Sequence, residues 1–333
     1  MRTLALILLA TGSLYAAIDG TVVNRTTGKP EPGVSITLVK PGQGGMRTIG
    51  TTVSDNAGHF VFARDEPGGG PQLLQASYKG VNYNKLMTPN IPTSNVELEV
   101  FEATKSPAVA RVAQRMLVIE PNSSQIAVSE TVMIQNDSNT TFTNPESGEL
   151  RFYLPPAANG QVRINAQTSQ GMPLPRPAEK TNETDVFKVD FPIKPGETEF
   201  DINYVLPAGS PFTFHGRVVG VKGMPSGPLR LIAPPGVTFS GTDIQQIGTE
   251  PKTQATIYNV TAPDLFSFDI AGTGSLHQQS TDTEDDADRP QVTEGNPQIY
   301  AHMGWLLTLA FGILAVGLAF LFRSSPVRSP YGK

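Results

Sequence analysis

The residue types that most often carry catalysis are scarce in this chain. It contains no cysteine, which excludes disulfides, zinc–thiolate sites and thiol nucleophiles. None of its four histidines, His59, His215, His277 and His302, begins a His-Glu-x-x-His or related ligand spacing. A Gly-x-Ser-x-Gly elbow and a phosphate-binding glycine loop are also missing from the sequence. We therefore predict no catalytic residue, no cofactor and no metal ion, and a protein that is not an enzyme.

The carboxylates are numerous, but their pattern does not select a site. Asp and Glu total 30 against 25 Lys and Arg, for a net charge of -5, and no cationic cluster is present. Nucleic acid is therefore not an expected partner, because phosphate binding needs concentrated positive charge. The densest acidic run, at 280–288, lacks the glycine turn and distal glutamate of a calcium loop. We interpret it as part of a solvated stalk.

Tyrosines near predicted loops are the remaining candidates for a ligand-binding site. Sugar rings stack on exposed aromatic side chains, with amide or carboxylate groups nearby for the hydroxyls. The candidates are Tyr78, Tyr83, Tyr153 and Tyr204. Tyr78 and Tyr204 are expected to lie on core faces of strands, whereas the sequence leaves Tyr83 open between core and surface. The candidate ligand-binding site is accordingly Tyr83 with its neighbours Asn82 and Asn84.

The elements that must position these residues have the pattern of strands and turns. Gly numbers 32 and Pro 29 in 333 residues, which is typical of turn-rich β proteins. Between 18 and 102, short alternating runs predict strands at 18–23, 34–39, 49–53, 59–62, 73–78 and 96–100. The turn at 54–58 offers side-chain caps and a glycine, Gly58, that can take a positive φ. We predict a small sandwich of about seven strands.

Three segments of this region carry a resemblance to a known family. They are Gly20-Thr21-Val22, the loop Thr27-Gly28-Lys29-Pro30 running to Ser35-Ile36, and Ser54-Asp55-Asn56-Ala57-Gly58-His59-Phe60-Val61-Phe62. Their order and spacing resemble the carboxypeptidase regulatory-like domain, a transthyretin-like sandwich grouped with carbohydrate-binding-like folds. The resemblance covers about 80 of the 333 residues. It implies an extracytoplasmic accessory module without an active site, although the family's Pro-Gly-x-Tyr segment is replaced at 67–72 by Pro-Gly-Gly-Gly-Pro-Gln.

A second β region follows at 104–271. Strands are predicted at 109–119, 125–134, 150–154, 162–164, 186–191, 200–206, 212–221, 229–233, 237–239, 253–258 and 266–270. The region looks similar to uncharacterised Ig-like ectodomains of bacterial envelope proteins at Glu130, Asn136, Leu154-Pro155, and the turn 194–197 with the strand 200–206 that follows it. We predict an Ig-like sandwich and prefer one unit over a split near 207. The fold class is thus all-β, with tandem sandwiches.

Both ends of the chain predict export and anchoring. Residues 1–17 combine Arg2 with a short apolar run, as in a signal peptide, but Tyr15 leaves cleavage after Ala17 open. Residues 303–322 are 20 residues without charge, enough for a transmembrane helix. The cations of 323–333 predict a cytoplasmic tail. The stalk at 272–299 then joins the sandwiches to a single-pass span in the inner membrane, with the N-terminus outside.

These elements predict only a general class of function. We predict a non-catalytic interaction protein that presents its sandwiches to an envelope protein partner, and carbohydrate or peptidoglycan binding is the alternative. Small residues at Gly304, Thr308 and Gly312 leave open a weak homodimer through the span. An exposed aromatic strip beside 79–84 would favour a glycan. An unpaired edge strand or an apolar patch would favour a protein.

Overall fold

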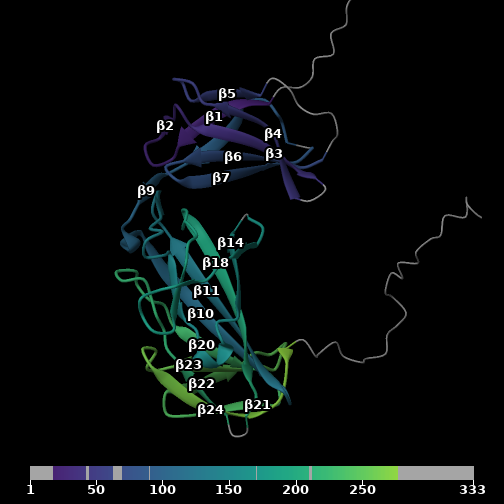
Figure 1. The fold of residues 1–333 in the computed structure, drawn as a ribbon, viewed down its shortest axis with the longest axis vertical. Helices are drawn as coiled ribbons and strands as arrows, with labels where there is room; N and C mark the ends of the chain where they lie inside the picture. The colour runs from purple at the N-terminus through teal and green to yellow at the C-terminus, as the bar shows by residue number, and fades with distance from the viewer. Residues whose placement is uncertain are drawn as a thin grey trace, which may run out of the picture. The chain divides into compact units, whose positions relative to one another are not determined.

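The computed structural model describes residues 18–42, 45–62, 70–89, 91–169, 171–209 and 212–276 (Figure 1). Contacts divide the chain into units 1–279 and 280–333, and all described residues belong to the first. These residues are strands and loops with two single-turn 3-10 helices, η1 (Pro107–Val109) and η2 (Pro156–Ala158), which confirms the all-β class. Within the described ranges, no helix is long and apolar enough to cross a membrane. The predicted leader, span and tail, and most of the stalk, lie outside the described residues.

The first β region consists of two four-stranded sheets. In one, β1 (Ile18–Asn24) pairs with β2 (Lys29–Pro30) and β5 (His59–Phe62) antiparallel and with β8 (Val96–Val100) parallel. The other has the antiparallel order β4 (Gly45–Val53), β3 (Ser35–Gly42), β6 (Gln72–Tyr78), β7 (Val81–Met87). Alternate residues of both sheets, such as Val22, Ile36 and Phe60, are buried in one shared core.

Besides the two-residue β2, which was predicted as part of a loop, the strand of this region that the sequence interpretation missed is β7. It pairs with β6 through a two-residue turn, Lys79-Gly80, in which Tyr78 faces Val81. Both turn residues have positive φ, 48° at Lys79 and 78° at Gly80, as in the primed turns that match strand twist. The segment carrying Tyr83 is therefore a strand with alternating burial rather than a binding loop.

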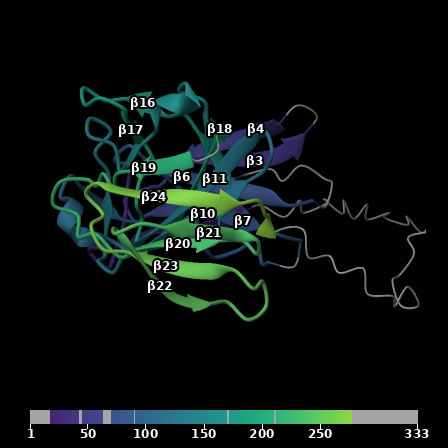
Figure 2. The ribbon, with the colours of Figure 1, turned by 90° about the horizontal axis from the view of Figure 1, so that it is seen from below.

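The second β region is built on an eight-stranded sheet (Figure 2). Its order is β15 (Leu174–Arg176), β14 (Val162–Thr168), β18 (Gly196–Pro207), β11 (Gln125–Asn136), β10 (Ala110–Pro121), β20 (Leu229–Ala233), β23 (Thr256–Val260), β22 (Ile244–Thr249). Two three-stranded sheets accompany it: β13 (Leu150–Tyr153), β17 (Val186–Val189), β16 (Glu179–Lys180), and β19 (Phe212–Gly216), β24 (Phe266–Gly272), β21 (Val237–Ser240). The short strands β9 (Glu102–Thr104) and β12 (Thr140–Phe142) pair in parallel.

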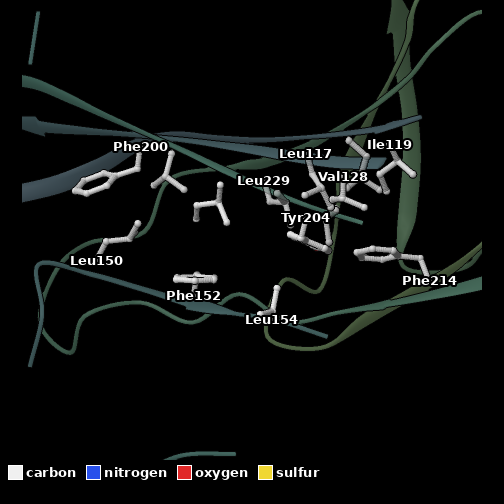
Figure 3. Close-up of a cluster of buried hydrophobic side chains, with 14 of the residues drawn as sticks. Leu117, Ile119, Val128, Leu150, Phe152, Leu154, Phe200, Tyr204, Phe214 and Leu229 are labelled. Carbon is white, nitrogen blue, oxygen red and sulfur yellow. The ribbon is translucent and has the colours of Figure 1, made fainter. Parts of the chain in front are cut away.

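One hydrophobic cluster joins these sheets. It runs from Ala110 to Ile270 and includes residues on both sides of Pro207. Figure 3 shows Phe200 and Leu117, from the large sheet, facing Phe152 and Phe214 from the two small sheets. The large sheet and the small sheets therefore form two layers that share one core.

Candidate functional site

The structure places Tyr83 at a contact between the two β regions. Its side chain is 5% exposed, and its hydroxyl lies 2.9 Å from the Thr141 hydroxyl and donates to the Phe101 carbonyl at 3.1 Å. The Lys194 ammonium lies 5.1 Å from the ring centroid and donates to the Asn82 carbonyl at 2.5 Å. The interpretation of Tyr83 as an exposed surface for stacking is therefore wrong, because the alternation of the strand turns the ring inward.

The two asparagines of the predicted site point away from Tyr83. Both are exposed, on the opposite face of β7. The Asn82 side chain accepts from Ser77 at 2.7 Å, and that of Asn84 accepts from Gln75 at 3.2 Å. These are cross-strand pairs with β6. The three residues chosen from the sequence thus do not converge on one surface.

Burial at this contact changes two ionisation equilibria. It raises the pKa of the Tyr83 phenol, against the lowering effect of its hydrogen bonds. Burial also lowers the pKa of Lys194 from 10.5 to about 8. Desolvation disfavours the charged form of both groups, which accounts for both directions.

A polar cluster beside the link between the two regions escaped the sequence interpretation. The buried Asn24 amide donates to Glu31 and Glu102, each at 2.8 Å, and the Tyr78 hydroxyl donates to Glu102 at 2.7 Å. Lys79 also forms an ion pair with Glu102. The pKa of the Glu102 carboxyl is lowered to about 2, mainly by its hydrogen bond from Lys79 and to a smaller extent by those from Tyr78 and Asn24. Tyr78 is half-buried rather than core. Because these groups satisfy one another, the cluster is structural.

A buried ion pair in the second β region has a perturbed pKa, as active-site residues often do, but the cavity beside it is too small for a ligand. Arg115 and Glu130 approach to 3.3 Å with side chains 5% and 10% exposed. Burial raises the pKa of Glu130, opposed by the Arg115 charge, and such shifts cluster at functional sites. The adjoining cavity, lined by Tyr153 and Tyr204 among others, is about 20 Å³. That volume holds about one water, whereas small-ligand sites measure roughly 300–1,000 Å³.

Among the described residues, strand β22 is an open edge of the large sheet (Figure 2). Its sequence, Ile-Gln-Gln-Ile-Gly-Thr, has no charge and no proline, and Ile247, at a bulge, is 52% exposed. The opposite edge, β15, contains Pro175 and is three residues long. Short length, charged side chains, proline and β-bulges are the usual protections of an edge strand, and of these four β22 has only the bulge.

An apolar strip on the outer face of the large sheet leads to this edge. Val118 is opposite Ile232, and Ile232 is opposite Ile257, so the strip crosses β10, β20 and β23. All three are partly exposed, and they alternate with residues buried in the core. Ile257 in turn faces Gly248 of β22. The strip and the edge form one surface, which we call the β22 surface.

A groove of about 430 Å³ lies between two loops of the second region. One wall is the segment from Leu154 to Gly160, and the other is the segment from Lys180 to Phe187. No group of three His, Cys, Asp or Glu residues in the described ranges could hold a metal ion. The groove is a candidate binding site because of its volume and its mixed polar and apolar lining.

Comparison with known proteins identifies no family. No family model and no curated protein matches the chain. The M1 zinc metallopeptidase of Deinococcus radiodurans is similar at 14% identity and a TM-score of 0.28, over 49% of this chain and 42% of the peptidase. A mutant of that peptidase bound to a Tyr-Ser-Ala substrate is similar at 12% identity, with the same TM-score and coverage. This similarity assigns no activity, and the resemblance to the carboxypeptidase regulatory-like domain stays a prediction.

Proposed function

We propose that this chain is a non-catalytic, membrane-anchored protein that presents its β-sandwiches to a protein partner outside the cytoplasm. The observation that carries the proposal is the β22 surface. An unpaired strand edge offers a row of N–H and C=O groups to an added strand, and the adjoining apolar strip offers side-chain contacts. The sequence supports the anchoring, through the leader predicted at 1–17 and the span predicted at 303–322.

Charge at both ends of β22 defines the partner further. Asp243 precedes the strand and Glu250 follows it. Two copies of β22 paired antiparallel about their centre would place Asp243 opposite Glu250, and like charges directly opposite destabilise a pair of strands. The surface therefore fits an extended segment with a short uncharged apolar core and basic residues at its ends.

The alternative, carbohydrate binding at 82–84, loses support because Tyr83 is buried. Sugar stacking there would require the ring to leave its contacts with Thr141 and Lys194. A glycan function would need a different surface.

Site-specific photocrosslinking of the full chain in its native membranes tests the proposal. A photoreactive residue at Ile247 is expected to give one discrete crosslinked protein, whose crosslinked peptide is an extended segment flanked by basic residues. The substitution Gln245→Pro should abolish this product, because proline bends the strand and disturbs the geometry of its edge. Leu174, exposed on the other edge, is the matched control position.

Two results would contradict the proposal. One is equal crosslinking from Ile247 and Leu174, which would indicate random collision. The other is a product that survives Gln245→Pro while circular dichroism shows the variant folded.

A further inference from the structure

The groove between the 154–160 and 180–187 segments carries an inference that does not depend on the proposed protein partner. A hydrogen bond from the Leu154 amide to the Asp185 carbonyl, 3.0 Å long, ties the two walls together. The second wall is the turn between β16 and β17 (Figure 2), closed by the bond from the Thr181 amide to the Val186 carbonyl at 3.0 Å. The groove is thus formed by two connected backbone segments.

Some polar groups of the groove are already used by the fold. The two carboxylate oxygens of Glu183 accept from Arg151 at 2.8 Å and from Arg217 at 3.3 Å. The Thr181 hydroxyl donates to the Val186 carbonyl at 2.9 Å. These groups stabilise the wall and are not available to a ligand.

Four other side chains of the groove remain free. Within the described part of the chain, Asn159, Lys180, Asn182 and Asp185 have no side-chain hydrogen bond or ion pair. They supply two amides, one ammonium and one carboxylate, so donors and acceptors are mixed and the charges of the four cancel. Leu154, Pro155 and Phe187 add apolar surface to the same groove.

Two of the free residues have an uncommon backbone conformation. Asn159 and Asp185, on opposite walls, have φ values of 52° and 59°. This left-handed region is sparsely populated by non-glycine residues and recurs at ligand sites. Because glycine adopts the same conformation without strain, each side chain can be removed while its backbone is kept.

We propose that this groove binds a neutral polyhydroxylated ligand, of the size of a mono- or disaccharide. Hydroxyl groups both donate and accept, which matches the amides together with Lys180 and Asp185. Apolar C–H faces of a sugar ring would lie against Pro155 and Phe187. A fully apolar ligand would desolvate four polar side chains without replacing their hydrogen bonds. The groove belongs to the second β region, outside the residues that resemble the regulatory-like family.

Ligand-observed saturation-transfer NMR on the detergent-solubilised full chain tests this assignment. The probes are maltose and N,N′-diacetylchitobiose as neutral disaccharides, and dialanine as a zwitterion that would also suit one ammonium and one carboxylate. We expect transfer to at least one disaccharide. Asn159→Gly and Asp185→Gly should each weaken its binding roughly three- to tenfold, the effect of losing one hydrogen bond.

Asn95→Gly is the matched control. Asn95 is exposed with a φ of 55°, lies in the first β region, and should leave binding unchanged. Transfer to dialanine alone would overturn the saccharide assignment. Absence of transfer to all three probes, or equal weakening by Asn95→Gly, would show that the groove is not the binding site.

Discussion

The phenol oxygen of Tyr83, on β7, lies 2.9 Å from the hydroxyl oxygen of Thr141, on β12, and both side chains are buried. The two residues are 58 positions apart and come from different β regions. Beside them, β9 and β12 pair in parallel, and Lys194 reaches back to the Asn82 carbonyl. The surface that the sequence suggested for a ligand is therefore covered by another part of the same chain.

Substitutions at Tyr83 should thus act on stability. Tyr83→Phe removes the hydrogen bonds to Thr141 and Phe101 and should cost about 1 kcal/mol, whereas Tyr83→Ala also removes a buried ring and should cost about 3–5 kcal/mol. Urea unfolding of the solubilised chain, followed by circular dichroism, measures both. A neutral Tyr83→Ala variant would contradict the burial of the ring.

Lys194 should make stability depend on pH. Its pKa falls from 10.5 to about 8 in the folded chain, so between these values the unfolded chain binds the extra proton. Stability due to this group therefore rises with pH across that window. The difference in unfolding free energy, wild type minus Lys194→Met, should increase from pH 7 to pH 10. Tyrosine ionisation is common to both proteins and cancels, and a constant difference would show that Lys194 is not desolvated.

The Arg115–Glu130 pair is expected to be structural. Glu130→Gln leaves a buried cation without its counter-charge and should destabilise the fold by about 3–5 kcal/mol. The double change Arg115→Met with Glu130→Leu should cost far less than the single one, because no charge then stays buried. Denaturant unfolding of the three proteins gives the comparison. A double variant as unstable as Glu130→Gln would mean that the charges themselves are needed.

Local patterns in the sequence predicted much of the fold. The alternation of apolar residues through 200–206 corresponds to β18, in which Phe200, Ile202, Tyr204 and Leu206 are buried. The turn before β5 has Gly58 at a φ of 75°, as predicted. Both features depend on neighbours within a few residues, where backbone sterics and side-chain periodicity are decisive.

The candidate site was harder to predict because it depends on distant partners. Val81 and Tyr83 share one face of a strand, a period of two that could have indicated burial. The Lys-Gly turn before them is not among the dipeptides that usually form a two-residue hairpin turn, so the sequence did not indicate where β7 begins. No local sequence pattern indicates that Asn24 donates a hydrogen bond to Glu102, 78 positions away, or that Val118 lies beside Ile232.

Gly58 and Gly80 provide a matched test of the turn geometry. Both have positive φ, 75° and 78°, but a Cβ at Gly58 would lie 2.8 Å from the Pro30 Cβ and 2.9 Å from the Val22 carbonyl oxygen, whereas Gly80 has open space. Each alanine substitution should cost about 1–2 kcal/mol from the left-handed conformation. Gly58→Ala should be clearly worse because backbone must also move. Equal losses in urea unfolding would contradict the close packing at Gly58.

Membrane anchoring can be tested independently of any partner. The uncharged stretch at 303–322 and the leader at 1–17 predict that the full chain stays in the membrane pellet after alkaline extraction. Deleting 303–322 should move the protein to the soluble extracytoplasmic fraction, with Ile18 as its first residue if cleavage follows Ala17. Deleting the acidic run 280–288 is the control and should leave the protein in the pellet, because a solvated stalk does not hold it there. Retention of the 303–322 deletion in the pellet would show that another segment anchors the chain.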